Sequence, residues 1–211
     1  MTKLEPVRDH WWWRPGWKVG RSFYTWHVTF ADQPAAQRLV ADYAHALAAL
    51  PMFDPVPVRW LHLTLQGIGF TDEVPRGDVD RIVATARKRC AELEPFTVVI
   101  GPAHVDPESI QMPARPLEPL AELRLAIRAA IGDVWGPDNV PEPEEGFRAH
   151  VSLGYANAAG PAAPVAKALD VHGGHTAEVT VTSVSLIDLN RDDKAYEWTD
   201  VATVTLGSPP A

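Results

Sequence analysis

Two four-residue segments of the chain pair a histidine with a hydroxyl side chain two positions later: residues 62–65 read HLTL and residues 150–153 read HVSL. Side chains alternate between the two faces of a β-strand, so the histidine and the hydroxyl of each segment share one face. Histidine gains or loses a proton near neutral pH, and a hydroxyl can donate a hydrogen bond. Each segment therefore offers a proton-transfer group beside a hydrogen-bond donor.

A third segment of this type, HVTF, starts at His27. Strands are rich in these residue types, which raises the frequency of such matches by chance. His27 precedes the first expected helix, whereas the other two segments occupy corresponding places in two similar stretches of sequence. The expected catalytic side chains are therefore His62, Thr64, His150 and Ser152. We expect His27 to line the same cleft from a neighbouring strand.

The spacing of apolar residues predicts the elements that position these segments. Apolar residues three or four positions apart indicate helices, and runs of β-branched and aromatic residues indicate strands. The expected helices cover residues 34–50, 78–93, 117–135 and 164–169. The expected strands cover residues 22–30, 58–70, 96–101, 109–112, 147–155, 179–189 and 196–206, the last two as a closing hairpin. This order favours an α+β or mixed α/β fold with largely antiparallel pairing.

The succession of helix, proline-rich connection, histidine strand and second helix occurs twice, in residues 34–93 and 117–169. Two similar halves would bring the two histidine strands together near the middle of the molecule. We therefore expect a single domain over residues 1–211, with two lobes around a central cleft.

Residues 1–20 precede the first expected strand and are rich in aromatic side chains. They hold Trp11, Trp12, Trp13 and Trp17, with Arg14 and Lys18 among them. These rings either stack on a nucleotide base or seal an edge of the core. We favour packing, because buried aromatic rings contribute strongly to packing energies, and we expect this segment to lie against the domain.

Composition restricts the function further. Cys90 is the only cysteine, so the chain cannot form an internal disulfide or a thiolate-rich zinc site. No apolar run is long enough to span a bilayer, and residues 1–9 carry charges of both signs, unlike a signal peptide. With 19 Lys and Arg against 27 Asp and Glu, the net charge of −8 disfavours binding along a long phosphate backbone. We expect a cytoplasmic monomer that binds no membrane.

The spaced pair of segments, each after a helix and an irregular connection, resembles the two-histidine (2H) phosphoesterase superfamily, and specifically its bacterial 2′-5′ RNA ligase-like and cyclic phosphodiesterase members. The resemblance covers roughly residues 23–206 and includes the closing hairpin. It implies a bilobal, duplicated fold with two largely antiparallel sheets flanked by helices and both histidines in a central cleft. It also implies action on 2′,3′-cyclic phosphates or 2′-5′ linkages without a metal or a nucleotide cofactor.

The residue types suit that chemistry. In-line opening of a cyclic phosphodiester needs a base to take a proton from water and an acid to protonate the leaving sugar oxygen, and two histidines can share these roles. Thr64 and Ser152 would donate hydrogen bonds to the non-bridging oxygens, where negative charge concentrates. By microscopic reversibility, the same pair could join a 5′-hydroxyl to a cyclic phosphate. The sequence leaves open which histidine is the acid.

RNA-directed relatives often carry a basic residue just beyond the second segment, where this chain has Gly154 and Tyr155. Arg148 should share a face with His150 and could supply the positive charge, or it could pair with Glu144 or Glu145 at the surface. Tyr155 and Trp60 could stack on a base or belong to the core. The acidic composition, and the lack of a basic residue just beyond the second segment, favour a nucleotide or a short RNA as the substrate.

Two other classes of function stay open at this stage. The same cleft could bind a nucleotide without catalysis, or it could belong to an RNA end-joining ligase. We expect no metal site, because the chain lacks a His-x-x-x-His pair and a compact cluster of histidines and carboxylates. The remaining histidines of interest, His104, His172 and His175, are expected in loops or turns.

Overall fold

The computed structural model describes residues 5–171 and 174–207, and this part of the chain holds four helices and ten strands. The helices are α1 (Pro34–Ala48), α2 (Arg76–Cys90), α3 (Glu118–Trp135) and α4 (Ala162–Val171). The strands are β1 (Phe23–Thr29), β2 (Phe53–Pro55), β3 (His62–Phe70), β4 (Phe96–Ile100), β5 (His104–Asp106), β6 (Ser109–Arg115), β7 (His150–Ala156), β8 (Ala177–Val181), β9 (Ser183–Asn190) and β10 (Glu197–Thr205).

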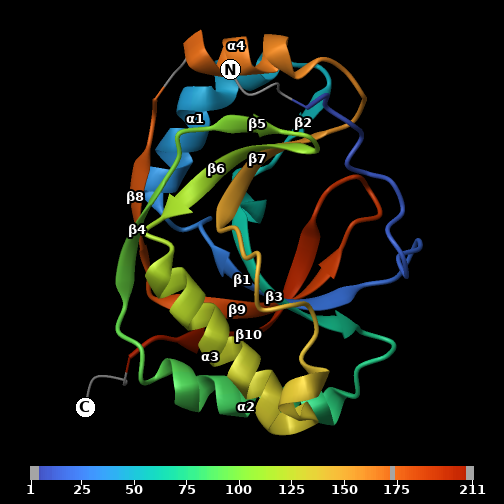
Figure 1. The fold of residues 1–211 in the computed structure, drawn as a ribbon, viewed down its shortest axis with the longest axis vertical. Helices are drawn as coiled ribbons and strands as arrows, with labels where there is room; N and C mark the ends of the chain where they lie inside the picture. Colours follow the sequence, from blue (N-terminus) through green and yellow to red (C-terminus); the bar gives the residue numbers. More distant parts are fainter. Residues whose placement is uncertain (1–4, 172–173, 208–211) are drawn as a thin grey trace.

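The strands form two antiparallel sheets. One has the order β10-β9-β1-β3, and the other has the order β2-β7-β6-β4-β8 with β5 paired to β6. Helices α2 and α3 pack on each other and contact β10 and β3, whereas α1 contacts β8 and α4 contacts β5. Figure 1 shows the α2–α3 pair beside the first sheet and α1 with α4 at the opposite end of the molecule. The expected mixed α/β fold with two antiparallel sheets is confirmed.

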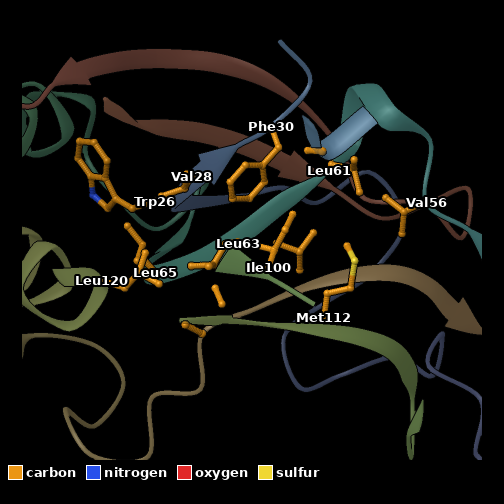
Figure 2. Packing of buried hydrophobic residues seen from close by; sticks show 14 of the residues in the cluster. Trp26, Val28, Phe30, Val56, Leu61, Leu63, Leu65, Ile100, Met112 and Leu120 are labelled. Carbon is orange, nitrogen blue, oxygen red and sulfur yellow. The ribbon is translucent and has the colours of Figure 1, made fainter. Parts of the chain in front are cut away.

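The hydrophobic core fills the space between the sheets. Figure 2 shows Trp26 of β1 and Leu63 and Leu65 of β3 on one side, with Ile100 of β4 and Met112 of β6 on the other. All five side chains are buried. Because alternate residues of β3 face this core, His62 and Thr64 are turned toward the other face of the sheet.

Three expectations about the elements were wrong. Residues 58–60 form a 3-10 turn and β3 starts only at His62, whereas Phe53–Pro55 of the proline-rich connection pairs with β7 as β2. The expected strand 179–189 is two strands, because β8 pairs with β4 in one sheet and β9 pairs with β1 in the other. His104, expected in a loop, lies in β5. The β-branched and apolar residues from 179 to 189 favour strand throughout and do not mark the change of partner. Strands β2 and β5 are only three residues long and depend on their pairing with β7 and β6.

The N-terminal segment, residues 5–22, contacts both sheets, because the His10 N–H donates to the carbonyl of Ala156 in β7 and the Trp17 ring packs on Phe70 of β3. Val7 forms an antiparallel bridge with Gly160 and is buried. The tryptophans divide into two kinds, because Trp11 is 8% exposed while Trp12 and Trp13 are 48% and 49% exposed. The expected packing against the core is therefore seen for the Trp11 side chain, but the Trp12 and Trp13 side chains are exposed.

Within the described residues, none of the helices combines the length and the apolar character needed to cross a membrane. His172 and Gly173 lie outside the described part of the chain, and His175 follows α4 without belonging to a helix or a strand.

Candidate active site

His62 and His150 are held in the same way by the backbone. His62 Nδ1 lies 2.8 Å from the carbonyl oxygen of Trp60, and His150 Nδ1 lies 2.8 Å from that of Arg148, in each case two residues earlier. A carbonyl oxygen only accepts, so Nδ1 of each ring carries the hydrogen. In the neutral ring, Nε2 is then the nitrogen with a free lone pair. Both histidines thus have the tautomer that leaves Nε2 available to exchange a proton.

The two histidines line one cavity of about 570 Å³, together with Thr64 and Ser152. They reach it from β3 and β7, which belong to different sheets but contact each other. The volume lies in the range of small-molecule sites, roughly 300–1,000 Å³. The cavity is therefore large enough for a nucleotide and brings the four expected side chains to one place.

His27 lies directly against His62. The two rings are stacked, with centroids 4.4 Å apart and planes 5° apart. His27 Nε2 is 3.2 Å from Thr64 Oγ1, because β1 and β3 pair His27 with Thr64 in register. His27 also lines the cavity, but it is only 1% exposed and its Nδ1 has no hydrogen-bond partner among the described residues.

Burial favours the neutral form of all three rings. It lowers the pKa of His62 to about 4, with the charge of His150 acting in the same direction and the hydrogen bond to Trp60 opposing it. Burial and the neighbouring His62 hold the pKa of His27 well below its usual value. Burial also lowers the pKa of His150, with Arg148 adding to this effect through its charge and Asp106 opposing it. A bound phosphate would raise all three pKa values, because a negative charge favours the protonated ring.

Tyr155 reaches the cavity through an irregularity in the sheet. Simple alternation would place it on the face opposite His150 and Ser152. The pairing of β6 with β7 shifts register between Ile110 and Gln111, which lie opposite Gly154 and Ser152, and Tyr155 lines the cavity beyond this shift. A β-bulge of this kind re-aims the side chains that follow it.

Arg148 and Trp60 lie outside the lining of this cavity. Arg148 pairs with Asp106 of β5 at 3.0 Å, so the expected alternative partners, Glu144 and Glu145, were wrong. It lines two smaller neighbouring pockets beside His150. Trp60 packs against Trp198 with ring centroids 4.6 Å apart.

Several cavity residues were not expected from the sequence. They include Arg8, His10, Arg14, Glu108, Arg191 and Tyr196. His10 is stacked on Tyr155 with centroids 4.3 Å apart, and its Nε2 is 2.8 Å from the Tyr196 hydroxyl. Burial, Arg14 and Arg191 together lower the pKa of His10 to about 3, so this ring is neutral. The basic and aromatic residues of the N-terminal segment were the one sequence signal that could have pointed to this part of the cavity.

Among the residues that the structure describes, no group of three or more His, Cys, Asp or Glu side chains is arranged to hold a metal ion.

A mixed α/β fold with two antiparallel sheets and one histidine segment from each sheet at a shared cavity defines the two-histidine phosphoesterase class. The model of the 2′-5′ RNA ligase superfamily matches residues 32–193 of the chain. The chain therefore belongs to this superfamily, which confirms the resemblance found in the sequence. No curated protein matches it.

Solved structures share the fold. The protein TT0787 of Thermus thermophilus superposes with a TM-score of 0.68 at 18% identity, covering 89% of this chain and 100% of that chain. LigT of E. coli, crystallised with 3′-AMP, superposes with a TM-score of 0.63 at 17% identity, covering 88% of this chain and 98% of that chain. At these identities the likeness establishes a common fold.

Proposed function

We propose that the chain is a metal-independent phosphodiesterase that opens 2′,3′-cyclic phosphates or cleaves 2′-5′ linkages in nucleotides or short RNA. The observation that carries this proposal is the matched setting of His62 and His150. Each has its Nδ1 fixed by a backbone carbonyl and lines the same cavity, so two Nε2 atoms are available for the two proton transfers. Positioned general acid–base groups of this kind contribute about 10² to 10⁴ each in rate.

The surroundings of the two rings support a different role for each. His62 is buried deeply enough to stay neutral, so it acts as the general base that takes a proton from water. His150 is the more exposed ring. Burial lowers its pKa below the usual value, and the nearby Asp106 carboxylate opposes part of that shift. His150 therefore acts as the general acid that protonates the leaving sugar oxygen.

Thr64 and Ser152 donate hydrogen bonds to the non-bridging phosphate oxygens, where charge builds up in the transition state. His27 supports Thr64 in this role. When His27 donates Nε2–H to Thr64 Oγ1, the threonine hydroxyl keeps its own hydrogen for the phosphate. His27 is thus a positioning residue. Tyr155 offers a ring beside the cavity on which a base can stack.

Two other activities would use the same cavity. In an end-joining ligase the two histidines would exchange roles, and a 5′-hydroxyl would attack the cyclic phosphate. In a binding module the nucleotide would occupy the cavity without reaction. The crystal structure of E. coli LigT with 3′-AMP supports a nucleotide-sized ligand for this fold.

The proposal is tested by incubating the purified chain in EDTA with the four 2′,3′-cyclic nucleotides and with 2′-5′ dinucleotides, and separating the products by chromatography. Hydrolysis to nucleoside 2′- or 3′-phosphates supports the phosphodiesterase. A 2′-5′ linked product from RNA with a cyclic-phosphate end would identify the ligase instead. If calorimetry detects binding but no substrate is turned over, the enzymatic proposal is wrong.

A further inference from the structure

Three arginines line the cavity although none belongs to the two histidine segments. Arg8 and Arg14 come from the N-terminal segment, and Arg191 follows directly after β9. The carboxylate that faces them is Glu108, whose oxygens lie 3.0 Å from Arg8 Nε and 2.7 Å from Arg14 Nη2. Three guanidinium groups against one carboxylate leave an excess of positive charge, in a chain whose net charge is −8.

The two other carboxylates that line the cavity have different partners. Asp106 accepts a hydrogen bond from Arg148, and the Glu142 carboxylate accepts one from the backbone N–H of Gly67. Neither of these contacts involves the three arginines. The excess of positive charge beside Glu108 is therefore local.

Arg191 is the most deeply placed of the three, at 3% exposed. Its Nη2 donates to the backbone carbonyls of His10 and Trp12, at 3.1 and 3.3 Å, while its Nη1 has no hydrogen-bond partner among the described residues. Arg14 Nε likewise has none. A buried guanidinium without a carboxylate partner is costly, and an anion in the cavity would offset that cost.

The arginines lie close to the histidine pair. The ring of Tyr196 has its centroid 6.0 Å from that of His62 and 5.7 Å from Arg191 Cζ. One aromatic ring thus separates the guanidinium from a histidine expected to act in catalysis. In a nucleotide the ribose links a 2′,3′-cyclic phosphate to a phosphate on the 5′-oxygen, so one ligand presents a phosphate on each side of its sugar.

We infer that Arg14 and Arg191, with Arg8 at the more exposed edge, bind a second phosphate of the substrate, one nucleoside unit away from the cyclic phosphate. This inference rests on the proposed function, because it takes the histidine pair as the site of the first phosphate. Arginine is suited to binding this second phosphate, because its planar guanidinium donates two parallel hydrogen bonds to phosphate oxygens. The second phosphate is either a terminal 5′-phosphate or the internucleotide phosphate of a short RNA.

The test compares kcat/KM for three substrates that share the same reacting end. They are adenosine 2′,3′-cyclic phosphate, its 5′-phosphorylated form, and a diadenosine dinucleotide that ends in the cyclic phosphate. We expect at least one phosphate-bearing substrate to exceed the first by about tenfold or more, the effect of one charge-assisted hydrogen bond of ~1.5 kcal/mol. A preference for the 5′-phosphorylated form alone identifies a terminal phosphate, and a preference for the dinucleotide alone identifies an internucleotide phosphate.

Arg14→Gln should bring these ratios of kcat/KM close to one. Arg76→Gln is the matched control, because Arg76 is exposed and pairs with Asp80 on α2, and it should keep the wild-type ratios. Equal kcat/KM for all three substrates in the wild type, or unchanged ratios in Arg14→Gln, would overturn the inference and leave the phosphodiesterase proposal standing.

If no substrate is turned over, the phosphodiesterase proposal fails and calorimetric titration tests the second site by itself. The same three compounds are then compared as ligands of the wild type and of Arg14→Gln. If a phosphate-bearing compound binds the wild type more tightly than the first compound does, and Arg14→Gln loses this difference in Kd, the inference of an arginine site stands. Equal Kd values for all three would overturn it.

Discussion

The His27 ring lies flat against the His62 ring, with their planes 5° apart and their centroids 4.4 Å apart. His27 also contacts Thr64 through Nε2, so a single buried ring supports two of the four side chains expected to act on the phosphate. Because burial keeps His27 neutral, it carries no exchangeable charge, and its contribution is to orient its neighbours.

The supporting role of His27 can be measured with His27→Phe. Phenylalanine keeps a flat ring against His62 but cannot donate to Thr64, so we expect kcat to fall by about tenfold, the value of one hydrogen bond of ~1.4 kcal/mol. In a Thr64→Val background the same change should cost much less, since the bond is already absent. If the loss of kcat in the double variant equalled the sum of the losses in His27→Phe and Thr64→Val, expressed as free energies, His27 would not act through Thr64.

The hydroxyl groups of Thr64 and Ser152 should each be worth about 10² to 10³ in kcat, the usual cost of removing one donor to a developing negative charge. Thr64→Val and Ser152→Ala remove them with little change in volume. Thr64→Ser restores the donor and should recover most of the activity. If Thr64→Val and Thr64→Ser behaved alike, the threonine would not act as a donor.

The rate should depend on pH through both histidines. His62 must be neutral, so kcat/KM should fall as the pH drops through about 4. His150 must be protonated, and burial places its pKa below 6.5, so kcat/KM should also fall as the pH rises toward neutrality. The resulting bell-shaped profile should have its maximum below pH 6.5. The profile of kcat should lie at higher pH, because the bound phosphate raises both pKa values. A kcat/KM that rises steadily to pH 8 would contradict these roles.

Stability should also fall in acid. In the folded chain the pKa is about 4 for His62 and about 3 for His10, whereas the usual value of 6.5 applies when the chain is unfolded. Below pH 6.5 the unfolded state therefore binds more protons than the folded state. The free energy of unfolding therefore decreases as the pH falls from 6.5 toward 4, by ~1.4 kcal/mol per pH unit for each such histidine.

Urea titrations at several pH values measure this slope. His62→Gln should reduce it by about 1.4 kcal/mol per pH unit, because glutamine does not titrate. Arg76→Gln, which changes an exposed residue and no histidine, should keep the wild-type slope. An unchanged slope in His62→Gln would show that this ring is not buried in its neutral form.

Alternation along a strand was enough to predict which side chains share a face. It placed His62 with Thr64 on one face of β3 and Leu63 in the core, as the structure has them. The apolar spacing of three and four residues likewise located all four helices to within a few residues of their observed ends.

The rest of the cavity depends on features that periodicity does not encode. Tyr155 enters it after a shift in strand register, and Arg191 enters it from a turn. Arg14 reaches it from a segment with neither helix nor strand, whose path is fixed by contacts with distant residues such as Glu108. Tertiary packing determines these positions. The sequence could therefore indicate which residue types matter, but not that these side chains lie together at one cavity.

The most direct test of the two-histidine mechanism is single-turnover hydrolysis of a 2′,3′-cyclic nucleotide in EDTA by the wild type, His62→Ala and His150→Ala, with His45→Ala on the exposed side of α1 as a control. We expect each of the first two substitutions to lower the rate constant by about 10² to 10⁴ and the control to match the wild type. Hydrolysis that persists at the wild-type rate in either His62→Ala or His150→Ala would contradict the mechanism.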